Sequence, residues 1–125
     1  MTGNEVFDAA AAYLAQTRQD SEEWKPFVPH WLNLLLEESL PYENAWRTMQ
    51  GLELLQTAPC LTQDTMDEPL EYHEALVRIA LPYGLASDFW RDDDNDYRAN
   101  DFRARYVSAL EDCLRGEPQP IEDVY

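Results

Sequence analysis

The chain has 125 residues, of which 45% are hydrophobic and 12% are aromatic, a size and composition that suit one domain with a single core. Its 25 acidic and 9 basic residues give a formal net charge of −16 at pH 7, which disfavours binding to DNA and to anionic membranes. Its apolar stretches are far shorter than the roughly 20 residues of a membrane-spanning helix, and no basic signal-peptide region stands at its start. We therefore expect a protein that stays in the cytosol.

The amino-terminal residues predict a helix. Thr2 and Glu5 form a capping-box pattern, in which each side chain accepts a hydrogen bond from the backbone of the other residue. Apolar side chains then recur with helical spacing as far as Leu14, so the helix should end within residues 16–18. The following segment, 19–29, is polar and contains two prolines, which indicates a loop.

Two further helices should follow, separated by a proline. Pro29 suits the first turn of a helix that should run to about Leu40. Because a proline inside a helix lacks the N–H and crowds the preceding turn, Pro41 should interrupt it. A short helix should then cover residues 42–49 and stop at Gly51, a residue type that commonly caps helices.

A long connection, residues 52–69, separates the two halves of the sequence. It shows no helical period and contains two prolines, although short extended pieces around 52–55 and 60–62 are compatible with its composition. Loops longer than about 12 to 15 residues without structure of their own are uncommon in compact domains and tend to be functional.

The second half predicts more helix. Residues 70–90 carry apolar side chains at helical spacing but contain Pro82, so they form either a kinked helix or two helices that meet at residues 81–82. An acidic turn at 92–96 should cap a last helix that ends at Gly116. We thus predict an all-α fold, a small bundle of about five helices with one long irregular loop. A single helical domain should span residues 1–116, followed by an acidic flexible tail at 117–125.

No motif in the sequence predicts a catalytic, cofactor or metal site. Asp92, Asp94 and Asp96 have the spacing of the first ligands of a calcium-binding loop. Tyr97 stands where that loop needs glycine, however, and Arg103 stands where it needs glutamate. The turn is therefore interpreted as a helix cap, and we predict that the protein is not an enzyme.

Two sets of residues are our candidates for contact with protein partners. Trp24, Phe27 and Trp31 lie around two prolines ahead of the second helix. These rings belong either to the core or to a docking surface, where aromatic side chains bury much area at low entropic cost. The second set consists of the acidic residues of the long connection, which are Asp64, Asp67 and Glu68.

The second half also resembles a known family. Residues 80–86, Ala-Leu-Pro-Tyr-Gly-Leu-Ala, are followed by the acidic turn at 92–96 and then by Ala99, Phe102 and Tyr106. This order resembles the carboxyl-terminal half of small head-to-tail connector, or neck, proteins of tailed bacteriophages and prophages. In those proteins an "LPYGLA" helix, an acidic turn and a helix with an "A..F...Y" pattern follow one another.

Residues 29–33, Pro-His-Trp-Leu-Asn, resemble the "PWLN" opening of an earlier helix in the same family. The resemblance implies an all-helical subunit of a homo-oligomeric ring between portal and tail, with no catalysis and no cofactor. Its partners would be portal, tail-completion or like subunits in a virion assembled in the host cytoplasm. The acidity fits a DNA channel, because a duplex finds few cations there to exchange for its counterions. The Trp90-Arg91 pair after the motif, and the strong acidity, depart from the family's pattern.

Two other hypotheses stay open. An acidic protein can imitate DNA and inhibit a host nuclease or restriction system, which requires its carboxylates to be concentrated on one face. Here the acidic residues are spread along the chain, which favours the connector. An assembly chaperone for another phage protein is the third hypothesis, and its absence from finished particles would distinguish it.

Overall fold

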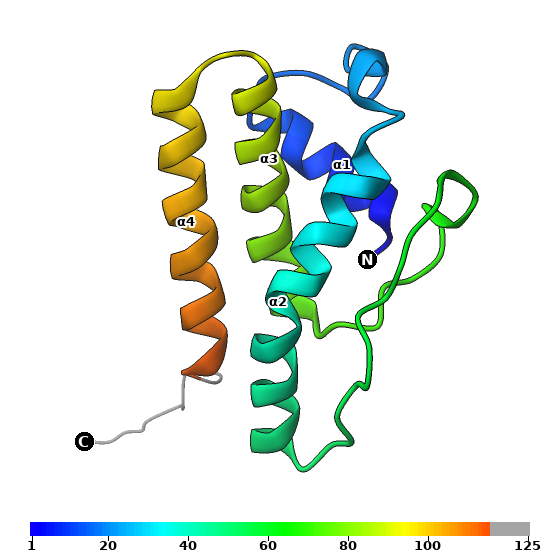
Figure 1. Ribbon diagram of the computed structural model, residues 1–125, viewed down its shortest axis with the longest axis vertical. Coiled ribbons are helices and arrows are strands. Elements are labelled where there is room, and N and C mark those ends of the chain that lie inside the picture. Colours follow the sequence, from blue (N-terminus) through cyan, green and yellow to red (C-terminus); the bar gives the residue numbers. More distant parts are fainter. Residues whose placement is uncertain (116–125) are drawn as a thin grey trace.

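The computed structural model describes residues 1–115 and shows an all-α fold within them, as predicted (Figure 1). Its α-helices are α1 (Gly3–Ala12), α2 (Val28–Gln50), α3 (Leu81–Asp92) and α4 (Asp96–Leu114). Three short elements accompany them, two 3-10 turns at Glu22–Trp24 and Gln63–Thr65 and a π-helical turn at Leu76–Ala80. The described residues thus form four α-helices and not about five. The predicted domain end at 116 and the tail at 117–125 lie outside them.

The difference in helix number arises at Pro41, which does not end α2. A proline inside a helix removes one backbone hydrogen bond and crowds the preceding turn. α2 nevertheless continues because contacts hold it on both sides of the proline. The hydroxyl of Ser39 donates to the carbonyl of Leu35 at 2.7 Å, and the carboxylate of Glu43 is buried against another segment. The helix ends as predicted at Gly51, whose φ of 73° is the left-handed conformation of a helix cap.

α1 begins as predicted but ends earlier. Thr2 and Glu5 form the capping box, each side chain accepting a hydrogen bond from the backbone N–H of the other residue. The helix ends at Ala12 and not within residues 16–18. After Ala12 the backbone tightens into bonds between residues three apart and reaches a left-handed residue, Ala15, with φ of 57°. Such a residue stops an α-helix whatever the apolar pattern around it.

The π-helical turn decides between the two forms predicted around Pro82. The backbone N–H of Leu81 bonds to the carbonyl of Leu76, five residues earlier, so this turn is wider than a turn of α-helix. Pro82 thereby stands in the first turn of α3, where no N–H is required. The π-helical turn and α3 form one continuous but irregular helical stretch.

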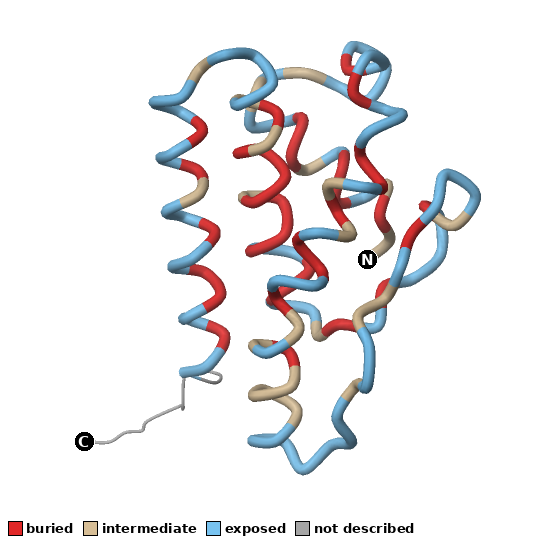
Figure 2. Tube along the Cα trace, viewed as in Figure 1, coloured by how far each residue is buried: buried red, intermediate tan, exposed pale blue. Residues whose placement is uncertain are grey.

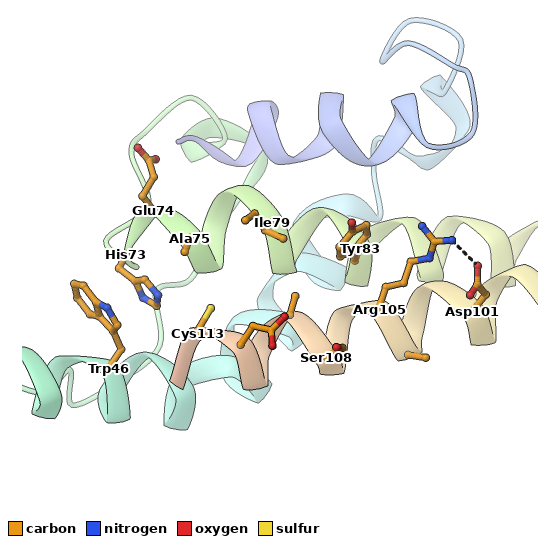
Figure 3. A pocket seen from close by; sticks show the side chains of 13 residues that line it. Trp46, His73, Glu74, Ala75, Ile79, Tyr83, Asp101, Arg105, Ser108 and Cys113 are labelled. Carbon is orange, nitrogen blue, oxygen red and sulfur yellow. Dashed lines mark ion pairs between the residues drawn. The ribbon is translucent and has the colours of Figure 1, made fainter. Parts of the chain in front are cut away.

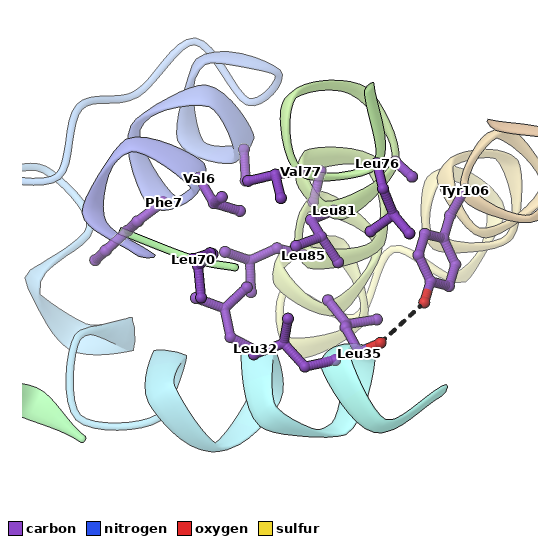
Figure 4. Close-up of a cluster of buried hydrophobic side chains, with 14 of the residues drawn as sticks. Val6, Phe7, Leu32, Leu35, Leu70, Leu76, Val77, Leu81, Leu85 and Tyr106 are labelled. Carbon is purple, nitrogen blue, oxygen red and sulfur yellow. Dashed lines mark hydrogen bonds between the residues drawn. The ribbon is translucent and has the colours of Figure 1, made fainter. Parts of the chain in front are cut away.

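α3 is the centre of the fold, because its contacts with the other three helices are the most extensive. Figure 1 shows α3 and α4 side by side as an antiparallel hairpin. Figure 2 shows that burial follows the facing sides of the helices, and Figure 4 shows the apolar side chains that meet between them. The largest fully buried side chains include Leu81, Leu85 and Phe89 of α3, and Tyr106 of α4.

Gly84 is the point where three helices meet. A Cβ atom there would lie 2.9 Å from Cδ2 of Leu35 on α2 and 3.0 Å from Cδ1 of Tyr106 on α4, closer than side chains normally approach. The lack of a side chain therefore lets α2 and α4 pack directly on the backbone of α3. The hydroxyl of Tyr106 also donates to the carbonyl of Leu35 at 3.4 Å, which joins α4 to α2.

The long connection is attached to α2 by two asparagines. Asn44 donates from Nδ2 to the carbonyl of Leu55 at 3.0 Å and accepts from the N–H of the same residue at 2.8 Å. Asn33 makes the same pair of bonds with Leu61, at 2.9 and 2.7 Å. The two asparagines are about three helical turns apart and so lie on one face of α2. The connection follows that face back along the helix.

Candidate functional site

Glu43 on α2 is the buried charged residue of the described chain, and its side chain has no solvent exposure. Its Oε2 accepts a hydrogen bond from Nε of Arg47, one turn later, at 2.7 Å. Its Oε1 accepts two more from His73, from the backbone N–H at 2.9 Å and from Nδ1 at 2.7 Å. Burial alone raises the pKa of a carboxyl group. Here these bonds outweigh it and lower the pKa of Glu43, so the carboxylate stays charged.

Arg47 balances the charge of Glu43 and fixes the backbone around it. Its Nη1 donates to the carbonyl of Glu53 and its Nη2 to the carbonyl of Glu71, both at 3.1 Å. These two carbonyls lie near the beginning and just past the end of the long connection. One side chain therefore holds both ends of that connection against the end of α2.

His73 is oriented from two sides. Its ring stacks on Trp46, with centroids 4.1 Å apart and planes inclined by 6°. The bond from Nδ1 to the carboxylate of Glu43 requires a proton on Nδ1, so Nε2 is the other ring nitrogen that can accept a hydrogen bond when it carries no proton. The side chain is only 7% exposed, and Nε2 is buried without a hydrogen-bond partner among the described residues. Such an unsatisfied buried atom costs about 1–3 kcal/mol.

His73 lies at one end of a groove of about 1150 Å³, which we call the α3–α4 groove (Figure 3). One wall consists of the π-helical turn and the start of α3, and the other is α4. Figure 3 shows His73 beside Trp46 and facing Cys113 across the groove. Its lining is mainly apolar and includes the large side chains of Trp46, Ile79 and Tyr83 and the small ones of Ala104 and Ala109.

The charged groups around the α3–α4 groove are already paired. Each acidic residue of the lining has an arginine partner about one turn away, as in Asp101–Arg105 at 3.2 Å, Asp112–Arg115 at 3.1 Å and Glu74–Arg78 at 3.3 Å. Exposed pairs of this kind add little stability. They do leave the groove close to neutral in a protein whose net charge is −16.

The arrangement is suited to binding. An imidazole held by a carboxylate can accept a hydrogen bond or a proton at its free nitrogen. The thiol of Cys113 lines the same groove, but no hydrogen bond joins it to His73, and burial raises its pKa, which disfavours the reactive thiolate. Within residues 1–115 no three His, Cys, Asp or Glu side chains are placed to hold a metal ion.

The structure separates the predicted aromatic set. Trp24 is buried, stacks on Phe89 with centroids 4.3 Å apart and donates from Nε1 to Asp92 at 2.8 Å. Phe27 is 55% exposed and stacks on Trp31, which is partly buried and also contacts Phe89. Trp24 therefore belongs to the core in this conformation, and Phe27 with Trp31 forms the accessible part of the set.

The predicted acidic set lies together on the long connection. Asp64, Asp67 and Glu68 are all exposed. Oδ1 of Asp67 accepts a hydrogen bond from Nδ2 of Asn4 at 2.6 Å, which places this part of the connection beside the start of α1. None of the three residues lines the α3–α4 groove, so they would form a separate contact surface.

The acidic turn at 92–96 has structural roles. Asp92 accepts the bond from the Trp24 indole, and Asp94 occupies a left-handed conformation with φ of 57°. The cap of α4 is Asn95, whose side chain accepts a bond from the N–H of Arg98 at 3.1 Å. The interpretation of the segment as a capping turn is thus correct, with an asparagine as the cap.

Sequence analysis missed the network of Glu43, Arg47 and His73. Glu43 and Arg47 are four residues apart on a helix, a spacing that is typical of exposed ion pairs and carries no sign of burial. His73 meets Glu43 only through folding, because 30 positions separate them in the sequence. The spacing of Glu43 and Arg47 could have indicated an ion pair, but nothing in the sequence indicated that His73 contacts it.

Comparisons with protein-family models, with curated proteins and with solved structures found no match for this chain. Within residues 1–115, no helix has the length and apolar character needed to cross a membrane. The site is therefore interpreted from its geometry alone.

We expect Glu43→Gln to destabilise the protein by about 2 to 4 kcal/mol at neutral pH, because Arg47 then lacks its buried counter-charge. The folded-state pKa of Glu43 is lowered, so the stability it contributes is present above its ordinary pKa of 4.5 and is lost as the pH falls below that value. Urea unfolding near pH 7 and near pH 3 measures the difference. Glu37→Gln, on an exposed part of α2, is the control. Equal losses at both pH values would contradict a charge-based role.

Asp88 on α3 is a second perturbed carboxyl group, outside the α3–α4 groove. Burial raises its pKa to about 6, an effect that Arg91 and Arg103 reduce and Glu38 increases. Arg103 and Glu38 form the ion pair that joins α4 to α2, so Asp88 lies beside a contact between helices. A carboxylate that is ionised against such an environment lowers stability at neutral pH.

Asp88→Asn should therefore stabilise the protein by about 1 to 2 kcal/mol near pH 7.5. Because the folded-state pKa of about 6 exceeds the ordinary value of 3.8, the gain should be full above pH 6 and should fade as the pH drops towards 3.8. Thermal unfolding near pH 7.5 and near pH 4 tests this, with the exposed Asp93→Asn as control. A gain of the same size near pH 4 would assign the effect to something other than ionisation.

Proposed function

We propose that this protein is a head-to-tail connector of a tailed bacteriophage or prophage, a structural subunit that joins portal and tail through protein contacts. It would assemble in the host cytoplasm and remain in the virion, in a ring of identical copies. The observation that carries the proposal is the location of the residues that resemble connector proteins. Residues 80–86, the turn at 92–96 and the stripe of Ala99, Phe102 and Tyr106 all belong to the hairpin of α3 and α4 or to the residue just before it.

The resembling residues fit one another physically. Gly84 of the "LPYGLA" segment leaves the space that Tyr106 of the "A..F...Y" stripe occupies. Phe102 of the same stripe packs against Tyr83, with ring centroids 6.1 Å apart. The hydroxyl of Ser87 donates to the carbonyl of Ala99 at 2.8 Å, which closes the hairpin near its turn. These contacts show that the resembling residues pack against one another, which supports the view that their similarity to connector proteins is not accidental.

The surface chemistry also supports contacts with proteins. A net charge of −16 repels DNA, which would allow a duplex to pass through a ring without binding to it. The α3–α4 groove, by contrast, is apolar and close to neutral, as the centres of protein interfaces are. Phe27 and Trp31 add a second exposed apolar patch beside the start of α2.

The proposal is tested in the phage or prophage that encodes the chain. Tagged protein should copurify with portal or tail-completion subunits and should be present in purified particles, as identified by mass spectrometry. Deletion of the gene should leave filled heads and separate tails, counted by electron microscopy. Recovery of a host nuclease or restriction component, with no protein in particles, would replace the connector by the DNA mimic. If the protein copurifies with portal or tail-completion subunits but is absent from purified particles, the chaperone hypothesis would replace the connector.

The acidic set of the long connection gives a more specific prediction. Replacing Asp64, Asp67 and Glu68 together by lysine should weaken copurification with the assembly partners several-fold, since charges at the edge of an interface steer association. The helical circular dichroism signal should not change, because all three residues are exposed.

The control for this variant carries the same change in net charge elsewhere. Glu37, Asp93 and Glu111 are exposed and form no hydrogen bond or ion pair with the long connection, so their replacement by lysine should leave copurification intact. Equal weakening by both sets would mean that net charge alone is responsible. Loss of helical signal in the first set would assign those residues to folding and not to contact.

A further inference from the structure

We propose that two copies of this chain associate through the face that carries the α3–α4 groove. In this pair α4 of each copy lies antiparallel to α4 of the other, about a two-fold axis at Ser108. The inference goes beyond the connector proposal, because a ring joins unlike faces of successive copies, whereas a two-fold contact joins one face to itself. Such a closed pair needs no other protein.

The charges along the groove side of α4 are self-complementary. Spacings of three and four residues place five side chains in one row of about 21 Å, which we call the charge row and which consists of Asp101, Arg105, Ser108, Asp112 and Arg115. Figure 3 shows the first three in this order along the helix. Reversing the row about Ser108 exchanges Asp101 with Arg115 and exchanges Arg105 with Asp112. An antiparallel second copy therefore brings an opposite charge to each charged member of the row.

The ion pairs within one copy leave atoms free for contacts with a second copy. Nη2 of Arg105 reaches Asp101 at 3.2 Å, and Nη1 of Arg115 reaches Oδ1 of Asp112 at 3.1 Å. A guanidinium group carries five N–H donors, so one such pair does not saturate it. Each of the four side chains is at least half exposed. A second copy can therefore reach them from solvent.

The net charge restricts where two copies can meet. Each copy carries −16, so most pairs of faces repel one another. The charge row, by contrast, contains as many arginines as aspartates. Glu74, the remaining acidic residue of the groove lining, is paired with Arg78. The groove face is therefore a neutral patch on which two acidic copies can approach each other.

The shape of this face allows two helices to pack closely. Ala104 and Ser108 are exposed and small, so they place little bulk between two helix axes. Beside them the groove presents apolar surface from Trp46, Ile79 and Tyr83, and Ile79 is 49% exposed. Removing such surface from water contributes about 25 cal/mol per Å². A second copy thus gains apolar burial next to the complementary charges.

Sedimentation equilibrium of the purified full chain measures the association directly. We expect a monomer–dimer equilibrium with a dissociation constant in the micromolar range, because exposed ion pairs each add little free energy. A chain that stays monomeric up to about 1 mM would overturn the proposal. Larger oligomers that form without a dimer would also overturn it.

Two charge-reversal variants test the antiparallel register. Arg105→Asp and Asp112→Arg each place like charges opposite one another twice in the pair. Each variant alone should therefore associate at least about tenfold more weakly than the wild type. An equimolar mixture of the two should recover association, because opposite charges then face each other again between unlike chains. A folding defect in either variant could not produce this recovery.

The matched controls are Arg18→Asp and Asp93→Arg, which make the same charge changes at exposed residues outside the α3–α4 groove. Alone and mixed, they should associate like the wild type. Weakening in the groove variants without recovery in their mixture would overturn the register. The same pattern in the controls would assign the effect to net charge and would overturn the contact.

A cysteine at the two-fold axis gives an independent measurement. Packed helices have axes about 8–10 Å apart and Cα atoms about 2.3 Å from each axis, so facing Cα atoms lie about 3.5–5.5 Å apart. This distance overlaps the range of about 4.4–6.8 Å that a disulfide spans. In a Cys60→Ser background, Ser108→Cys should form a covalent dimer when treated with oxidised glutathione.

Val107→Cys in the same background is the control, because Val107 is exposed on another side of α4. It should yield little covalent dimer, and equal yields from the two variants would overturn the two-fold axis at Ser108. Failure of the pair and failure of the connector function remain distinguishable. The first is measured on the purified chain, and the second by the presence of the protein in purified particles.

Discussion

The buried carboxylate of Glu43 determines how the end of α2 meets the rest of the molecule. An ion without water costs several kcal/mol unless its oxygens are fully bonded, and here three hydrogen bonds from Arg47 and His73 meet that requirement. Because one of them comes from the backbone of His73, the chain must enter the π-helical turn at a defined place beside α2. Arg47 then uses its remaining nitrogens to hold both ends of the long connection. The hydrogen bonds that hold α2 and the long connection together are thus the same bonds that orient His73 in the candidate site.

The continuity of α2 through Pro41 is part of the same constraint. Leu32, Leu35 and Leu36 are buried before the proline, and Glu43 is buried after it. A break at the proline would leave the carboxylate without its fixed distance from this apolar face. The two asparagines of α2 extend the argument, because their bonds to Leu55 and Leu61 require the same unbroken helix. The cost of one missing backbone bond is small compared with these contacts.

The parts of the fold that could be predicted from the sequence depend on local chemistry. The capping box at Thr2 and Glu5 and the glycine cap at Gly51 act within a few residues, and their patterns were sufficient. The predictions were wrong where distant contacts outweigh local preference, as at Pro41. The place of Trp24 in the core depends on Phe89 and Asp92, far along the chain. Likewise, the burial of Glu43 could not be derived from an ion-pair spacing that is usual on helix surfaces.

The contrast between the whole surface and the α3–α4 groove limits what the protein can bind. The excess of acidic residues creates a negative potential that extends over a screening length of about 8 Å, which disfavours the approach of polyanions. In the groove the acids are paired with arginines at about one turn, which confines their fields to the rim. The groove therefore offers shape and apolar area and not charge. Long-range charge thus acts against polyanions over the whole surface, whereas the groove differs from that surface through its neutral, apolar lining.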